Sequence, residues 1–141
     1  TFIIGGLTQM SHFISRIATV EIPVSNLESS MDFYMIVLGV HVESKGDKTA
    51  MLSFHTKGVP TIFLVETKEV RPLFFTNTHS SVIHSIIDFY TPLLKDFYQW
   101  LKKNKVEVGP LNVNEEGLGG FGFKDPDGNN LSASNIEHFG Q

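Results

Sequence analysis

Three side chains that could take part in acid–base chemistry recur at alternating positions of one predicted strand. The segment 82–90 has the β-branched and aromatic composition of a strand, and it carries His84, Asp88 and Tyr90. Because side chains alternate between the two faces of a strand, we expect these three on one face. A histidine, a carboxylate and a phenol there could transfer protons or form a hydrogen-bond network. The alternative is structural: His84 is a hydrogen-bonded strand residue, and Asp88 helps the following helix to begin.

The composition excludes several classes of function. The 141 residues include no cysteine, which rules out disulfides, thiolate nucleophiles and cysteine-based zinc sites and agrees with a cytoplasmic location. The net charge is −4 and no segment is strongly basic, so nucleic-acid binding is not expected. No apolar run approaches the roughly 20 residues that span a membrane. The glycine-rich run 117–122 lacks the lysine and the following helix of a phosphate loop, and a bent strand is predicted instead.

The first half of the chain reads as a strand, a helix and three further strands. The segment 16–24 is rich in β-branched residues and predicts the first strand. Apolar residues then recur at helical spacing between Asn26, which can cap the helix, and Gly39, which can end it in a left-handed conformation. Alternation of apolar and polar residues with intervening turns predicts three strands up to residue 67.

The same order returns in the second half, after a linker at 68–78. The strand 82–90 leads to a helix that is predicted to begin at Thr91-Pro92 and to end at Asn104, and the remaining strands fall within 105–136. An offset of 65 residues aligns the caps, the apolar stripes and the helix ends, which predicts an internal duplication. The expected fold class is α+β: two βαβββ modules that form a partly closed, barrel-like sheet with a concave cavity.

These elements belong to one domain, because a chain of this length fits a single core of ordinary size. Met10 is a candidate native start, so we expect the residues before the domain to be vector-derived or to come from a misassigned start. The predicted boundaries are an N-terminal extension at 1–14, a domain at 15–136 with module one at 15–67 and module two at 79–136, and a C-terminal tail at 137–141.

Motifs in both halves resemble those of a known superfamily. The run Val24-Ser25-Asn26-Leu27-Glu28-Ser29-Ser30, with Phe33-Tyr34 and Leu38-Gly39, resembles the first module of the vicinal oxygen chelate superfamily. The run Phe123-Lys124-Asp125-Pro126-Asp127-Gly128-Asn129 resembles its last hairpin. The superfamily includes glyoxalase I, bleomycin-resistance proteins, fosfomycin-resistance enzymes and extradiol dioxygenases. The likeness covers about residues 15–136, nearly the whole chain.

The resemblance implies a position for a metal site but not the residues to fill it. In the enzymes of the superfamily, inward side chains of the first, fourth, fifth and eighth strands hold one divalent metal, which polarises a substrate with two adjacent oxygens. These positions correspond here to Thr19, to Phe63 through Glu66, to His84 and to Ser132. The first-strand histidine and the last-strand glutamate are thus replaced by hydroxyls. Only His84 and Glu66 remain, whereas catalytic sites normally use three protein ligands.

The resemblance and the degraded ligand set together predict a protein that binds a small organic molecule in its cavity. The expected ligand-binding residues are Thr19, Phe63, Glu66, His84 and Ser132, no catalytic residue is assigned, and no cofactor is expected. Conventional metal-dependent glyoxalase or dioxygenase activity is disfavoured. Two alternatives stay open: a divalent-metal-dependent lyase or dioxygenase with an altered ligand set, and a non-catalytic dimeric interaction subunit. A cytoplasmic homodimer is expected, since members of the group often complete their sites across a symmetric interface.

Overall fold

A computed structural model describes residues 5–6 and 9–141, and the main elements of each module occur in the order that the duplication predicts, with a ribbon of two short strands between the modules. Residues 1–4 and 7–8 of the predicted N-terminal extension lie outside this description. The elements in chain order are β1 (Thr19–Val24), α1 (Leu27–Leu38), β2 (His41–Lys45), β3 (Thr49–Ser53), β4 (Thr61–Glu66), β5 (Phe75–Thr76), β6 (Ile83–His84), β7 (Ile87–Tyr90), α2 (Leu94–Lys103), β8 (Asn112–Val113), β9 (Gly119–Lys124) and β10 (Asn130–Ser134).

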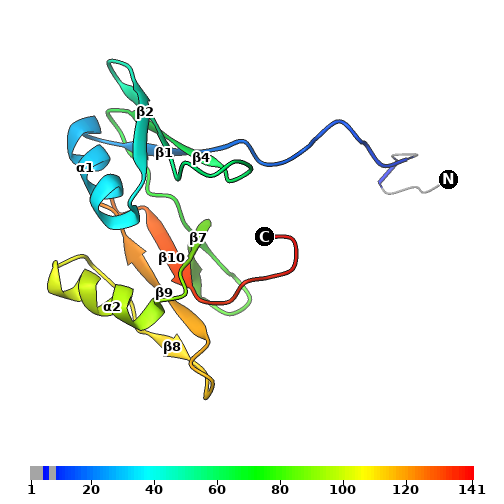
Figure 1. The fold of residues 1–141 in the computed structure, drawn as a ribbon, viewed down its shortest axis with the longest axis vertical. Helices are drawn as coiled ribbons and strands as arrows, with labels where there is room; N and C mark the ends of the chain where they lie inside the picture. Colours follow the sequence, from blue (N-terminus) through cyan, green and yellow to red (C-terminus); the bar gives the residue numbers. More distant parts are fainter. Residues whose placement is uncertain (1–4, 7–8) are drawn as a thin grey trace.

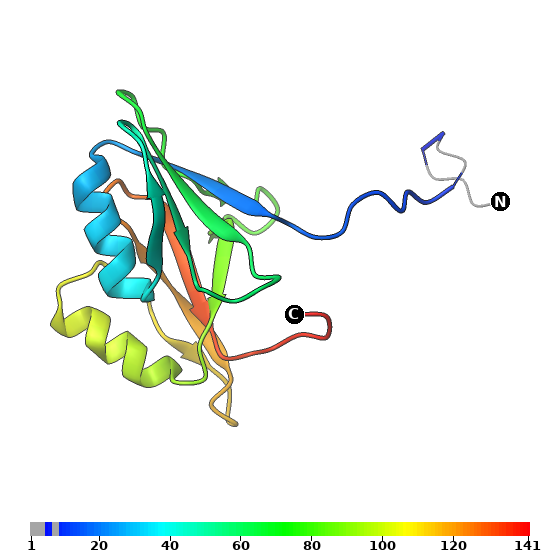
Figure 2. The ribbon, with the colours of Figure 1, turned by 45° about the horizontal axis from the view of Figure 1, so that its top comes forward.

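Each module builds one four-stranded sheet, and the two sheets have the same topology. The first has the order β1-β4-β3-β2 and the second β7-β10-β9-β8, so in both the first strand of the module lies beside its last. That pairing is parallel in both sheets. Both helices lie on the same side of the sheets (Figures 1 and 2), and neither sheet closes into a barrel. The α+β class and the two βαβββ modules are confirmed.

Helix α1 begins and ends where the sequence predicts. The side chain of Asn26 accepts a hydrogen bond of 2.9 Å from the backbone N–H of Ser29, which satisfies one of the free donors of the first turn. Gly39 has a φ of 72°, a left-handed conformation in which a side chain would be strained. Met31 and Tyr34 are buried against the sheet. Local sequence signals are therefore sufficient to define this helix.

Helix α2 departs from its prediction at both ends. It begins at Leu94 and has no side-chain cap, because the hydroxyl of Thr91 accepts its 3.1 Å hydrogen bond from Leu93 before the helix starts. The predicted left-handed stop at Asn104 is wrong. Asn104 has a φ of −93°, and the left-handed residue is Lys105, with a φ of 60°. A lysine gives no local signal for this conformation.

The helices also correct the spacing of the internal repeat. Buried residues of the two helices correspond at a spacing of 67 rather than 65 positions, as in Leu27 with Leu94 and Tyr34 with Leu101. With this spacing the counterpart of Thr19 in the second module is Ile86. His84 lies two positions earlier in the chain and is not the structural equivalent of Thr19.

The strand predicted at 82–90 is divided into two. β6 pairs with the short strand β5 in a separate antiparallel ribbon, and the chain bends at Ile86 before β7 joins the main sheet. His84 and Asp88 consequently belong to different sheets. The remaining strands, expected within 105–136, begin only at Asn112, and the segment 105–109 forms no strand of its own. Its place is taken by a single bridge between Val108 and Phe123, and β8 becomes the outer strand.

A buried polar cluster joins the two modules through the last hairpin. Asp125 accepts hydrogen bonds from the Tyr34 hydroxyl at 2.7 Å and from the Asn129 side-chain amide at 2.8 Å. The same amide donates to the backbone carbonyl of Pro23 at the end of β1, at 3.0 Å. The amide oxygen accepts from the backbone N–H of Leu73 in the linker at 2.8 Å. The hairpin motif therefore fixes module one, the linker and module two to one another.

The helices of the chain are short. Across the part of the chain that the structure describes, none is long and apolar enough to cross a membrane.

Candidate functional site

A cavity of about 670 Å³ lies between the two modules and is lined mainly by apolar side chains of both. Its walls come from β1, the end of α1, the loop between β3 and β4, β4 itself, β7 with the residue that follows it, the first turn of α2, and β10. The lining residues are Val20, Val37, Leu38, Phe54, Thr56, Val59, Pro60, Ile62, Ile87, Asp88, Phe89, Tyr90, Thr91, Phe97 and Ala133. A hollow of this size and apolar character is typical of small-molecule sites.

Aromatic rings give the cavity one continuous wall. The rings of Phe54 and Phe89 face each other across the modules with their centroids 6.3 Å apart. Phe89 and Phe97 both pack on the buried ring of Phe123, with centroids at 6.5 Å and 5.7 Å. Tilted and edge-on contacts of this kind are favourable between aromatic rings and keep their positions well defined. The cavity is therefore suited to a flat or branched apolar group.

Asp88 is the only charged residue among those that line this cavity. Its carboxylate accepts hydrogen bonds from the hydroxyls of Ser132 at 2.6 Å and Ser134 at 2.8 Å, both on the neighbouring strand β10. Two hydroxyl donors hold the carboxylate in one orientation on the face of the sheet opposite to Phe89. The carboxylate of Asp88 is therefore directed away from the ring-lined side of β7.

Two of the predicted ligand-binding residues lie on the open face of the first sheet. The hydroxyls of Thr19 on β1 and Thr61 on β4 are hydrogen-bonded to each other at 2.8 Å. Phe63 lies two residues further along β4, opposite Glu21, and shares this face. Neither Thr19 nor Phe63 lines the cavity between the modules. The structure therefore places these two residues on one face but outside the apolar hollow.

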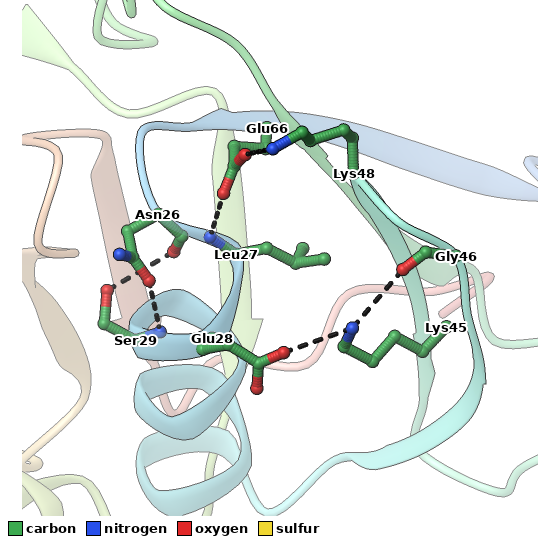
Figure 3. Close-up of polar contacts among 8 residues, drawn as sticks. All are labelled: Asn26, Leu27, Glu28, Ser29, Lys45, Gly46, Lys48 and Glu66. Carbon is green, nitrogen blue, oxygen red and sulfur yellow. Dashed lines mark hydrogen bonds and ion pairs between the residues drawn. The ribbon is translucent and has the colours of Figure 1, made fainter.

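Glu66 has a structural task at the start of helix α1 (Figure 3). It lies on the other face of β4 from Phe63, and its carboxylate accepts a 2.8 Å hydrogen bond from the backbone N–H of Leu27. The other carboxylate oxygen is 2.8 Å from the Lys48 ammonium. The hydrogen bond from Lys48 and then that from Leu27 lower the pKa of Glu66. Glu66 cannot converge on a ligand with Thr19, because the two side chains leave opposite faces of the sheet.

The remaining two predicted residues, His84 and Ser132, line a second and more polar hollow of about 480 Å³. The His84 ring stacks on Phe75 with the centroids 5.0 Å apart. Lys124 and Glu107 also line this hollow and form an ion pair of 2.9 Å. The structure thus brings His84 and Ser132 to one surface, although the Ser132 hydroxyl is already bonded to Asp88.

The residues at the positions implied by the superfamily do not fit a divalent metal. Thr19 and Ser132 offer hydroxyls that are engaged in hydrogen bonds, and Glu66 faces away from Thr19 and is held by Leu27 and Lys48. A stable site normally needs three protein ligands with nitrogen, sulfur or carboxylate donors. Among residues 5–6 and 9–141, no group of three or more His, Cys, Asp and Glu is placed to hold a metal ion.

A separate polar cluster lies on β2, the end of β3 and the turn after it, and none of its residues lines either hollow. The rings of His41 and His55 are stacked with centroids 3.8 Å apart and an angle of 6° between their planes. Glu43 contacts His55 and accepts a 2.6 Å hydrogen bond from the Ser53 hydroxyl, which lowers the pKa of Glu43. These side chains are largely exposed, and their network stabilises the edge strand of the first sheet.

Sequence reasoning missed most of the side chains that line the apolar cavity. Phe54 follows a strand and Phe97 lies on the apolar stripe of α2, so each also fits an ordinary core position. Ser134 was missed as a partner of Asp88 because the pairing of β7 with β10 joins segments 44 residues apart. The high phenylalanine content was the signal available, but it indicates a ring-lined interior without saying which rings face the hollow.

Comparison with known families gives one match that spans most of the chain. The profile of the Glyoxalase/Bleomycin resistance protein/Dioxygenase superfamily matches residues 16–132. No functionally curated protein matches the sequence significantly.

Several solved structures are similar to this chain. A genomically encoded fosfomycin resistance protein of Listeria monocytogenes has a TM-score of 0.68 at 15% identity, covering 86% of this chain and 93% of that one. A glyoxalase family protein of Enterococcus faecalis has a TM-score of 0.65 at 20% identity, covering 86% and 98%. An integron cassette protein of Vibrio cholerae has a TM-score of 0.60 at 26% identity, covering 90% and 98%. The first two likenesses, at such low identity, establish the fold alone.

Proposed function

We propose a binding function for this chain, which belongs to the glyoxalase/bleomycin resistance protein/dioxygenase superfamily. It binds a small, largely apolar organic molecule in the cavity between its modules. The observation that carries the proposal is the aromatic wall formed by Phe54, Phe89 and Phe97 around a hollow of about 670 Å³. Each apolar group that leaves water for such a wall contributes roughly 25 cal/mol per Å² of buried surface.

Binding is proposed to need no metal. The hydroxyls of Thr19 and Ser132 and the engaged carboxylate of Glu66 support this, because together they do not make a conventional ligand set. The earlier assignment of Thr19, Phe63, Glu66, His84 and Ser132 to ligand binding stays a prediction. None of these five residues lines the apolar cavity, so the proposed function assigns ligand binding to the residues that do line it.

The test uses N-phenyl-1-naphthylamine, a neutral dye whose fluorescence rises in apolar surroundings. We expect saturable binding to the wild type. Val59 lines the cavity and is 43% exposed, so Val59→Trp should fill the hollow with little effect on folding. The dye affinity should fall about tenfold or more in this variant, equivalent to about 1.4 kcal/mol. Ile36→Trp is the matched control, since Ile36 is 68% exposed and does not line the cavity. Equal affinity of the two variants would refute the proposal.

The alternative function is that of a metal-dependent lyase or dioxygenase with an altered ligand set. Measurements on the same protein preparation distinguish it from metal-free binding. Protein purified without chelator is analysed for metal and assayed with a hemithioacetal and a catechol in the presence of Ni²⁺, Zn²⁺, Mn²⁺ or Fe²⁺. We expect dye binding to be unchanged by EDTA. Stoichiometric metal that is lost on mutation of His84 would instead favour the enzyme.

A cytoplasmic homodimer is proposed as the working state. Apolar side chains of the β5–β6 ribbon and of the bend that follows it are solvent-exposed: Phe75 is 53% exposed, Ile83 58% and Ile86 58%. Patches of this kind mark interaction surfaces. Sedimentation should give a dimer for the wild type and a monomer for Ile83→Glu, and an unchanged dimer in the variant would remove the ribbon from the interface.

A further inference from the structure

Strand β7 borders the cavity with the backbone groups along its unpaired edge as well as with its side chains. The five consecutive residues from Ile87 to Thr91 all line the hollow. Side chains of one face can supply only alternate residues of a strand, so a continuous run must include the backbone. β7 is also the end strand of its sheet, with β10 on one side and no strand on the other among the described residues. The cavity therefore borders a free sheet edge.

The hydrogen-bond register between β7 and β10 shows which backbone groups of β7 point outward from its free edge. The N–H of Thr91 donates to the carbonyl of Ser134 on β10 at 2.8 Å. In a parallel ladder, the N–H and C=O of one residue point to the same side and those of the next residue to the other. Phe89 and Thr91 therefore bond to β10, and Asp88 and Tyr90 direct their N–H and C=O groups to the free edge.

We propose that the ligand of this cavity carries a secondary amide in an extended, peptide-like conformation and adds to the free edge of β7. This inference rests on the proposed function and names the chemical class of the ligand. Free edge groups are templates for an added strand, and main-chain hydrogen bonds are the usual source of affinity in such complexes. One ligand residue can accept from the N–H of Tyr90 and donate to the C=O of Asp88, which lie two positions apart, roughly 6.6 Å along the strand.

The cavity walls restrict the rest of the molecule. An apolar group beside the amide is expected to enter between the rings of Phe54 and Phe97. No cationic side chain is found among the described residues that line the cavity, so an anionic end would lose water there without gaining a partner, and the ends of the ligand should be capped or neutral. The class is thus an uncharged amide with an aromatic or branched side chain.

The probes are N-acetyl-phenylalanine methylamide and its ester analogue, in which an ester oxygen replaces the acetamide N–H. Both are used to displace N-phenyl-1-naphthylamine from the wild type. The two differ in one donor and hardly in shape, so the edge hydrogen bond alone separates them. We expect the amide to displace the dye about threefold to tenfold more strongly, the range of one hydrogen bond of ordinary net strength.

Two further measurements locate the contact. In ¹⁵N-labelled protein, both probes should shift the N–H resonance of Tyr90, because each has the carbonyl that accepts from it. Only the amide should also shift the ¹⁵N resonance of Phe89, whose peptide group contains the Asp88 carbonyl. The resonance of Thr91, whose N–H bonds to Ser134 on β10, is the built-in control. Tyr90→Pro removes the edge donor to the ligand carbonyl where a proline is tolerated, and Tyr90→Ala keeps it, so displacement of the dye by both probes should weaken in Tyr90→Pro relative to Tyr90→Ala.

The outcomes separate this inference from the proposed function. Displacement that is equal for amide and ester, with the dye still bound and Val59→Trp still weakening it, overturns the inference and leaves the cavity function standing. A dye that does not bind, or whose binding Val59→Trp leaves unchanged, overturns both. A preference for the amide with shifts at Tyr90 and Phe89 supports both, and this comparison needs no variant to fold.

Discussion

The hydroxyl of Tyr34 donates a 2.7 Å hydrogen bond to the carboxylate of Asp125, and the two residues lie 91 positions apart in different modules. Tyr34 is fully buried and Asp125 is 5% exposed. The carboxylate also accepts from the Asn129 amide, so its charge is compensated inside the protein. This contact links helix α1 to the last hairpin and fixes the relative position of the two sheets whose gap forms the cavity.

Replacing Tyr34 with Phe removes the donor and keeps the ring. We expect the free energy of unfolding to fall by about 1.5–3 kcal/mol, the usual range for a hydrogen bond to a charged group. Urea denaturation followed by circular dichroism measures this loss. Tyr98→Phe is the control, because Tyr98 packs on Phe121 and no hydrogen bond of its hydroxyl is found among the described residues. A loss of similar size in both variants would mean that the hydroxyl of Tyr34 contributes nothing specific.

The same residue predicts how stability depends on alkaline pH. Burial, and then the neighbouring charge of Asp125, raise the pKa of Tyr34 above its ordinary value of 10.0. The folded protein therefore retains a proton that the unfolded chain loses above pH 10, and unfolding becomes more favourable as the pH rises. The stability difference between wild type and Tyr34→Phe should shrink between pH 9 and pH 11. A difference that is constant over this range would show that the phenol ionises normally in the fold.

Glu66 should affect stability through helix α1 and not through a ligand. Its pKa is lowered by the hydrogen bond from Lys48, and then by that from Leu27, so the stabilisation is present above the unfolded pKa and is lost as the pH falls through the folded one. Glu66→Gln should lower the melting temperature at pH 7, and the effect should fade toward pH 3. Dye binding should be unchanged. An equal effect at both pH values, or weakened dye binding, would contradict this role.

The matched variant for Glu66 is Lys48→Met. It removes the ion pair of 2.8 Å but leaves the hydrogen bond between Glu66 and the backbone of Leu27. We expect a smaller fall in the melting temperature than in a variant such as Glu66→Ala, which loses both contacts. Differential scanning calorimetry of the three proteins in one buffer gives the comparison, and an equal fall for Lys48→Met and Glu66→Ala would mean that the helix contact is unimportant.

How far the sequence could predict this protein depends on whether a signal is local. The ends of α1 were predictable because Asn26 and Gly39 act on the backbone beside them. The end of α2 was not, since the left-handed residue is Lys105, a type without a local preference for that conformation, where the N–H of Val106 bonds back to the carbonyl of Leu101. The division of the strand at Ile86 follows from the pairing of β6 with β5, which no local pattern records. For the site, the resemblance pointed to Thr19, which lies on the face of its sheet opposite to the ring-lined cavity. The side chains that border this cavity are determined by how the two modules are joined, and no local pattern records that arrangement.

Two glycines of β9 provide a final prediction, because their surroundings differ. A Cβ on Gly120 would lie 2.5 Å from the backbone carbonyl of Ala133, too close without a shift of the strands. Gly120→Ala should therefore destabilise the fold by about 1–3 kcal/mol, as overpacking does. A Cβ on Gly122 would lie 3.6 Å from the carbonyl of Leu131, an ordinary contact. Gly122→Ala should be neutral or stabilise by up to about 1 kcal/mol, because alanine restricts the unfolded chain. Equal stabilities of the two variants in urea denaturation would show that the close approach of β9 to β10 does not require glycine.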